Sequence, residues 1–303
     1  MPDIDITKFR TTDFDEDIRM EYQQRGAVLE GTYYEEEMVG NESTFNVMGK
    51  QEAVQATTLY GDTPPPPNLA NYVRQVIPTK WMDTQWIDET EWHRSMATGG
   101  KLQPKYARNL AYSLGRAKDR IVLNAMVGTA MNREFNLQTQ LPTLTPAPFD
   151  PAQVIPHNDL PFSVDKIVQG VAKLKKDEAY DGRIWCAIDP WQEAQLMRDT
   201  QFTSFDFNAQ RPLQNGYLGS YYTVNFVCLS ILDEIEGLQT STVQTALMWN
   251  QDAVGFKRLQ PMETFVDVLP QKQMTIQLYC RATGGFTRIQ DKGVIKIESA
   301  IAA

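Results

Sequence analysis

Residues that commonly carry enzyme chemistry are scarce in this chain of 303 residues. It contains only two histidines, His93 and His157, and neither has a second metal ligand at helical spacing. Metal sites and Ser–His–Asp triads built on imidazole therefore have almost no raw material. We expect both histidines to lie on the surface or in a linker.

Glycine and acidic motifs indicate catalysis no more strongly. Gly99-Gly100-Lys101 lacks the upstream glycine of a phosphate-binding loop, and Gly284-Gly285 precedes an expected strand where a dinucleotide site needs a helix. Two carboxylates from Asp233, Glu234 and Glu236 could serve a glycosidase, but their polar surroundings favour a solvated loop. We predict no catalytic residue, no cofactor and no metal. An absence this broad favours a structural or binding role.

Cysteine usage and hydropathy indicate a reducing compartment and no membrane. Cys186, Cys228 and Cys280 are far apart in apolar surroundings, so we expect small core residues and no disulfide framework. No run approaches the ~20 apolar residues of a membrane span. Met1–Asp5 has no apolar signal-peptide core, and we expect synthesis in the cytosol.

The charge is concentrated in two segments. The chain carries 29 Lys and Arg against 38 Asp and Glu, a net charge of -9. Residues 1–42 hold twelve acids and four bases, a net -8, whereas residues 101–120 hold six bases and one acid. A chain this acidic is not expected to bind free DNA tightly, because such binding needs an excess of Lys and Arg. Two solvated faces are the simplest interpretation. The six bases are Lys101, Lys105, Arg108, Arg116, Lys118 and Arg120.

The acidic segment must be positioned by a surface elsewhere. Phe14, Ile18 and Tyr22 recur every four residues behind a cap at Thr12 or Asp13, which predicts a helix. An apolar stripe so thin does not hold an isolated helix in water. This helix is therefore expected to lie on another part of the protein.

Residues 43–92 show no helical pattern and are expected to be extended. Four consecutive prolines, Pro64–Pro67, impose polyproline II geometry in the middle. A long hairpin or loop that projects from the body fits this pattern. It needs a partner surface, because two strands alone are marginally stable. The expected strands are residues 45–48, 54–60 and 72–78.

Three tryptophans follow the extended segment. Trp81, Trp86 and Trp92 are spaced by five and six residues, which fits neither a helix nor a strict strand. They are either core anchors at the base of the extended segment or a buried subunit contact, where tryptophan is over-represented.

The clearest helix runs from Pro104 to about Val127. Proline suits the first turn, and apolar residues recur along one face with Gly115 in the middle. Residues 138–161 contain six prolines and are expected to be a linker between two folding units.

The second unit mixes helices and strands. A helix is expected after Ser163, and Asp189-Pro190-Trp191-Gln192 predicts a capping box with proline at the first helical position. The expected strands are residues 183–188, 221–232, 263–268, 274–281 and 294–297, and residues 246–249 and 253–256 are further short apolar segments. The fold class is α+β, with no βαβ rhythm.

A series of short motifs runs through nearly the whole chain. It begins with Tyr22–Leu29 and continues with Gly49-Lys50 and Gly61–Pro64. Its later members are Asp189–Gln192 with Leu196 and Asp199, then Gly216–Gly219, Asn250–Gly255 and Gly284–Arg288. In this order and spacing the motifs resemble the major capsid protein of tailed bacteriophages of the Hong Kong 97 type. Phe286 stands where that family has a small residue.

This resemblance implies a Hong Kong 97-type α+β fold with four parts. Residues 1–42 correspond to an N-terminal arm and residues 43–92 to an extended loop that reaches over a neighbouring subunit. Residues 93–161 and 261–303 correspond to a peripheral domain, whose long spine helix lies at about 104–127. Residues 162–260 correspond to the axial domain.

The resemblance also implies a structural role without enzyme activity. Proteins of this family self-assemble as hexamers and pentamers into an icosahedral shell around double-stranded DNA. The expected partners are further copies of the chain, portal, scaffolding and decoration proteins, and DNA held nonspecifically. Assembly is expected in the host cytoplasm and residence in the virion. The expected subunit-interface residues are Phe14, Ile18, Tyr22, Tyr60, Tyr72, Trp81 and Trp86.

The six bases of residues 101–120 have two expected roles. They lie near the acidic segment of the same or an adjacent subunit, or they face packaged DNA as nonspecific counter-charges. Deleting residues 1–30 would impair shell formation in the first case.

Two alternatives differ in what the protein does. An encapsulin-like nanocompartment shell has the same fold and encloses cargo enzymes, but the acidic arm and long extended segment favour the phage form. A phage carbohydrate-binding protein or glycosidase rests only on scattered acids and tryptophans.

Overall fold

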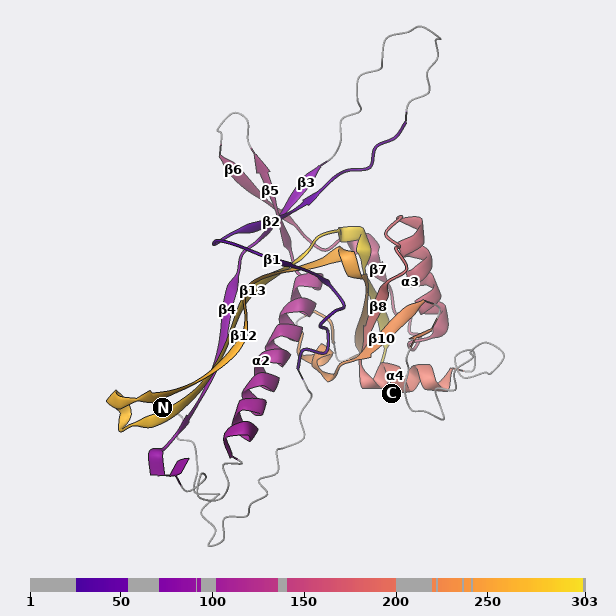
Figure 1. Cartoon of the computed structure of the whole chain (residues 1–303). Helices are drawn as coiled ribbons and strands as arrows, with labels where there is room; N and C mark the ends of the chain where they lie inside the picture. Colours follow the sequence, from indigo (N-terminus) through magenta and orange to yellow (C-terminus); the bar gives the residue numbers. More distant parts are fainter. Residues whose placement is uncertain are drawn as a thin grey trace. The chain divides into compact units, whose positions relative to one another are not determined.

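A computed structural model describes residues 26–53, 71–90, 92–93, 102–135, 141–199, 220–221, 223–235, 237–240 and 242–301 (Figure 1). Among these residues no helix combines the length and apolarity needed to span a bilayer. The chain divides into two units, and the first consists of residues 1–27, 80–117 and 261–282. The second consists of residues 28–79, 118–260 and 283–303. The division falls within the long helix and three strands, as described below.

A six-stranded sheet with the order β7-β14-β11-β8-β10-β9 lies in the second unit. Its strands are β7 (Val154–Ile155), β8 (Ile184–Ile188), β9 (Ser220–Tyr221), β10 (Val224–Cys228), β11 (Val243–Asn250) and β14 (Val294–Ala300). β11 is antiparallel to both neighbours, whereas β8 and β10 are parallel, with α4 (Pro190–Arg198) between them in the chain. One βαβ connection is therefore present, and the expectation of no such rhythm misses it.

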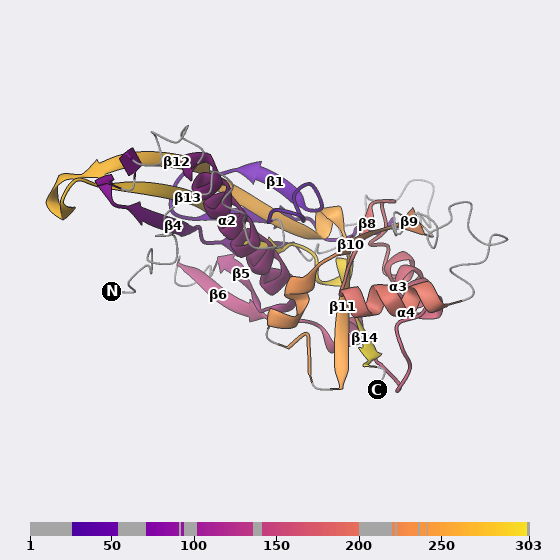
Figure 2. The ribbon, with the colours of Figure 1, turned by 90° about the horizontal axis from the view of Figure 1, so that it is seen from below.

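Side chains alternate between two cores on the two faces of this sheet. Cys186 and Met248 belong to the core beneath α3 (Val164–Lys176) and α4, whereas Ala187 and Trp249 belong to the opposite core. Figures 1 and 2 show α3 and α4 on the same side of the sheet. The last turns of α2 (Leu102–Val127) contribute to the opposite core. Burial of both faces explains why β8 is apolar throughout and why β11 is apolar from Ala246 to Trp249.

Caps define the starts of α3 and α4. The Asp189 side chain accepts from the Trp191 amide at 2.9 Å, and the Gln192 side chain accepts from the Asp189 amide, which confirms the predicted capping box. α3 begins after Ser163 as expected, but the Ser163 side chain makes no capping bond. Asp199, at the end of α4, accepts from the Val164 amide at 3.1 Å instead.

A four-stranded antiparallel sheet with the order β2-β3-β5-β6 also belongs to the second unit. Its strands are β2 (Ser43–Val47), β3 (Tyr72–Val76), β5 (Ala130–Phe135) and β6 (Pro142–Ala147). β2 and β3 confirm two of the strands expected in the extended segment. β6 lies inside the expected linker 138–161, so that interpretation is wrong for this stretch. Its prolines are tolerated because β6 is an edge strand, where missing amide donors break no ladder.

The first unit contains most of β4 (Thr79–Ile87) and parts of β12 (Val254–Leu269), β13 (Thr275–Arg288) and α2. These strands, with β1 (Tyr34–Glu37), form a sheet with the order β1-β12-β13-β4. The core of the first unit is a cluster of Ile87, Leu110, Leu114, Leu278 and Cys280, on which Trp81 and Trp92 pack. α2 confirms the predicted helix and begins two residues earlier.

The segment after β10 differs from expectation. The strand expected over 221–232 ends at Cys228, and a 3₁₀ turn (Ser230–Glu234) follows. Leu229, Ile231 and Leu232 are buried in the core that also contains Ala187 and Trp249. Cys228 is exposed, so its assignment to the core is wrong, whereas Cys186 and Cys280 are buried as expected.

Candidate functional site

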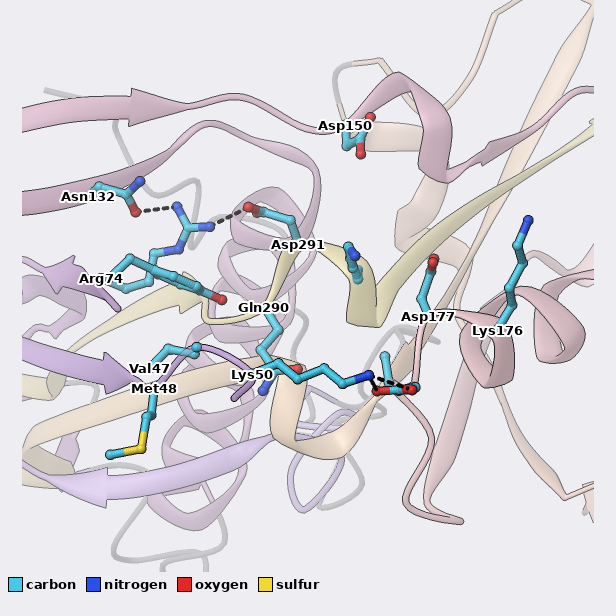
Figure 3. A pocket seen from close by; sticks show the side chains of 15 residues that line it. Val47, Met48, Lys50, Arg74, Asn132, Asp150, Lys176, Asp177, Gln290 and Asp291 are labelled. Atoms are coloured by element: carbon cyan, nitrogen blue, oxygen red, sulfur yellow. Dashed lines mark hydrogen bonds and ion pairs between the residues drawn. The ribbon is translucent and has the colours of Figure 1, made fainter. Parts of the chain in front are cut away.

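A cleft of about 850 Å³ opens in the second unit beside the base of the extended segment (Figure 3). It is lined from β3, β5, the residues after β2, the turn after α3 and the 3₁₀ turn Asp291–Gly293. Its 15 lining residues include no Ser, Cys or His. The cleft therefore lacks the usual nucleophiles and the usual neutral-pH base.

One ion pair crosses this cleft. Lys50 Nζ lies 2.8 Å from Glu178 Oε2, and both side chains are exposed. The interaction raises the pKa of Lys50 and lowers the pKa of Glu178, chiefly through their hydrogen bond. Gly49 donates its amide to Asn71 Oδ1 at 3.0 Å, which joins the chain on either side of residues 54–70. The Lys50–Glu178 pair ties the extended segment to the end of α3, although exposed pairs contribute little stability.

A buried arginine forms one wall of the cleft. Arg74 is 1% exposed, and its guanidinium donates to Asn132 Oδ1 at 2.7 Å, to Asp291 Oδ2 at 2.5 Å and to the Ile289 carbonyl at 3.3 Å. Figure 3 shows Arg74 between Asn132 and Asp291. Arg74 therefore fastens β3 to β5 and to the turn that follows β13.

A second arginine shares the same carboxylate. Arg288 is completely buried, and its Nε donates to Asp291 Oδ1 at 2.7 Å. Its four remaining N–H groups donate to the carbonyls of Met126, Gly128, Ala147 and Pro148 at 2.8 to 3.1 Å. All five guanidinium donors are thus satisfied, and the end of α2 is joined to the end of β6. This arrangement holds elements together and leaves no free group for chemistry.

A buried lysine has a comparable structural role. Lys166 is 4% exposed and donates to the carbonyls of His157, Leu160 and Glu298 at 2.9 to 3.0 Å. Burial lowers its pKa to about 8. It holds the turn before α3 against β14. Sequence reasoning missed Arg74, Lys166 and Asp291, and it treated Arg288 only as part of a motif. Their partners lie mostly far along the chain, so no local spacing reveals them.

Three of the expected interface residues can be placed. Tyr72 is half-buried and donates to the Ile289 carbonyl at 3.3 Å. Trp81 packs on the core of the first unit. Trp86 is 37% exposed, and Lys272 Nζ lies 3.5 Å from its ring centroid. Their role in a subunit interface stays a prediction. Phe14, Ile18, Tyr22 and Tyr60 lie outside the described residues.

Five of the six basic residues of the segment 101–120 lie on α2, and the sixth, Lys101, is outside the described residues. Lys118 Nζ lies 3.3 Å from Glu30 Oε1 and 5.0 Å from the ring centroid of Phe256. Arg120 pairs with Glu234, one of the acids expected in a solvated loop. Whether Lys105, Arg108 and Arg116 face an acidic segment or DNA stays a prediction.

The chain resembles known proteins over nearly its full length. A family model described as phage capsid protein matches residues 6–300. The head structure of Helicobacter pylori bacteriophage KHP40 has a TM-score of 0.70 at 9% identity, covering 95% of each chain. The capsid of Ralstonia phage GP4 has a TM-score of 0.68 at 13% identity, covering 97% of this chain and 96% of that one.

A third solved structure agrees with these two. The capsid of cyanophage P-SCSP1u has a TM-score of 0.67 at 12% identity, covering 98% of this chain and 95% of that one. At such identities the likeness establishes the fold. None of the curated proteins compared matches this sequence. Because the family model spans residues 6–300, the chain belongs to the phage capsid protein family, as a structural major capsid protein with a Hong Kong 97-type fold.

Proposed function

We propose that this capsid protein assembles with further copies of itself, as hexamers and pentamers, into an icosahedral shell around double-stranded phage DNA. The observation that carries the proposal is the family match over residues 6–300. The internal chemistry agrees with a structural role without enzyme activity. The cleft beside Lys50 and Arg74 has no Ser, Cys or His among its lining residues, and its carboxylates are engaged by neighbouring side chains or amides.

The proposed parts of the subunit follow the family. Residues 1–42 form the N-terminal arm, and residues 43–92 form the extended loop. Residues 93–161 and 261–303 form the peripheral domain, and residues 162–260 form the axial domain. The antiparallel pairing of β2 with β3 supports the extended loop, because the two ends of a looped-out segment must lie side by side. The 26 residues of α2 support its assignment as the spine helix.

We propose further partners on the same basis. These are portal, scaffolding and decoration proteins, with assembly in the host cytoplasm. DNA is proposed to contact the shell nonspecifically, through basic side chains such as that of Arg108, which is exposed on α2.

Negative-stain microscopy and sedimentation of the purified chain test the main proposal. We expect closed shells of hundreds of subunits. A small soluble species under all assembly conditions would contradict it. The contents of particles from infected cells provide a second test, because packaged cargo enzymes in place of DNA would indicate a nanocompartment.

Charge reversal tests the DNA contact. Arg108→Glu should leave empty shells intact and lower the fraction of particles that retain DNA, because a counter-charge becomes a repulsive group. Lys80→Glu makes the same change of charge at an exposed site on β4 and serves as the control. Equal DNA retention in the two variants would count against the contact.

A further inference from the structure

Residues 26–42 of the proposed arm carry five carboxylates and no cation. Every one of these carboxylates is ion-paired within the second unit. The pairs are Glu30 with Lys118 at 3.3 Å, Glu35 with Arg258 at 3.3 Å, Glu36 with Lys257, Glu37 with Arg258 at 3.1 Å, and Glu42 with Arg133 at 3.4 Å. Such complete pairing indicates that these charges serve the subunit itself.

Strand pairing explains why three of the pairs form together. β1 lies parallel to β12, in a register that places Glu35, Glu36 and Glu37 beside Phe256, Lys257 and Arg258. Lys257 is 7% exposed and its ammonium lies 4.3 Å from the ring centroid of Phe45, so the cation of the Glu36 pair is shielded from water, whereas the Glu36 side chain is 38% exposed. Shielding makes such a pair stronger than an exposed one.

Backbone contacts hold the same segment independently of its charge. Asp119 of α2 is 1% exposed and accepts from the amides of Val28 at 3.1 Å and Leu29 at 3.2 Å. The Trp249 indole donates to the Thr32 carbonyl at 2.8 Å. Leu29 is completely buried in the core that the last turns of α2 help to form.

Gly26, the first described residue, lies in the first unit, where its backbone contacts the backbone of Gly115. A Cβ added to Gly115 of α2 would lie 2.7 Å from the carbonyl carbon of Gly26. Real Cβ atoms do not come this close to backbone, so the contact requires glycine. Gly26 therefore marks the point at which the segment meets the helix.

From these contacts we infer that residues 26–42 form an intrasubunit strap, and that the part of the arm that binds a second copy of the chain is confined to residues 1–25. The strap takes up five of the eight net negative charges of residues 1–42, and residues 1–25 hold seven acids and four bases. The strap itself is a property of one subunit. The role of residues 1–25 rests on the proposed shell function.

Hydrogen exchange of the full-length chain tests the strap. The amides of Val28, Leu29 and Met38, and those amides of β1 that face β12, should be protected in the unassembled subunit, to the same degree as in the shell. Protection that appears only in the shell would overturn the strap, because it would place these contacts between subunits.

A charge variant tests the pairs directly. Arg258→Glu reverses two pairs at once and should speed exchange of the β1 amides about tenfold in the unassembled subunit. Glu134→Lys changes an exposed carboxylate that has no partner in the described part of the chain, and it should leave β1 unchanged. Adding Glu35→Arg and Glu37→Arg to Arg258→Glu restores opposite charges and should restore protection. Failure of this rescue would count against the pairs, even if Arg258→Glu alone folds poorly.

Two truncations separate the strap from the shell function. Deleting residues 1–25 should leave the Tm of the unassembled subunit within about 1 °C and reduce shell formation, whereas deleting residues 1–42 should also lower the Tm. Normal shells from the shorter truncation would overturn the role of residues 1–25. If the full-length chain itself never forms shells, the proposed function fails while the exchange result still decides the strap.

Discussion

The guanidinium of Arg288 makes five hydrogen bonds, and their number determines how much stability is lost when Arg288 is replaced. Four backbone carbonyls and one carboxylate accept from its guanidinium, and none of these bonds is exposed at the arginine. The Met126 carbonyl, whose bond to Arg288 is buried, would lose its donor at a place that bulk water does not reach. The consequence should be larger than for an arginine whose partners are solvated.

Arg288→Lys should lower the free energy of unfolding by about 3 kcal/mol, although it keeps the positive charge. A lysine has three donors at one point and cannot reach acceptors spread around a planar fork. Chemical denaturation of the unassembled subunit measures the change. Arg183→Lys, at an exposed position, is the control and should stay within about 0.5 kcal/mol. Equal effects in the two variants would contradict the prediction.

Lys166 predicts a dependence on pH. Burial lowers its pKa in the folded protein to about 8, below its value of about 10.4 in the unfolded chain. Between these values the unfolded chain binds more protons at this residue, so its contribution to stability rises as the pH increases. The slope of unfolding free energy against pH should therefore be more positive in the native chain than in Lys166→Met between about pH 8 and 10.4. Parallel slopes would show that Lys166 does not titrate in this window.

At the scale of elements, local sequence signals predicted the ends of a helix correctly where nearby residues determine those ends. The predicted capping box of Asp189 and the helix ending near Val127 are both found, because caps and apolar periodicity act within a few residues. β6 was missed because two of its six residues are prolines and because, in the described part of the chain, it pairs with β5 alone. Cys228 was wrongly expected in the core for a related reason: burial of the last residue of a strand depends on distant elements that pack against it, which its sequence neighbours do not reveal.

Gly115→Ala should have opposite effects in two forms of the chain. Alanine normally stabilises a helix interior over glycine by about 1 kcal/mol. In the full-length chain we expect a loss of about 1 kcal/mol or more, because the new Cβ meets the backbone of Gly26. In a chain that lacks residues 1–27 the same substitution should stabilise. Thermal unfolding of the four proteins measures both signs, and the same sign in both backgrounds would exclude the contact.

For the whole molecule, the sequence predicted the fold family and the long helix that carries five of the six basic residues of 101–120. It did not predict which charges pair. Lys118 and Glu30 are 88 residues apart, and no pattern in either segment indicates the other. The acidic segment therefore looked like one arm, whereas Glu30 to Glu42 are paired within the subunit.

Trp81 and Trp86 offer a test of what the shell needs. Trp81→Ala should lower the unfolding free energy of the unassembled subunit by about 3 kcal/mol, because this ring packs on a core. Trp86→Ala should change it by less than about 1 kcal/mol and raise the subunit concentration needed for assembly about tenfold. Light scattering against concentration measures the second effect. Unimpaired assembly of Trp86→Ala would remove this residue from the interface.

The position of β6 has a consequence for solubility before assembly. β6 is an outer strand of its sheet, and Pro142 and Pro146 cannot donate to a further strand. Because β5 pairs along the whole of β6, the backbone nitrogens of these prolines must lie on the free edge of the strand, as does that of Leu144. A foreign strand would find few amide donors there, so fibre growth from this edge is disfavoured. A chain that is proposed to assemble in hundreds of copies can then accumulate at high concentration without aggregating through this edge.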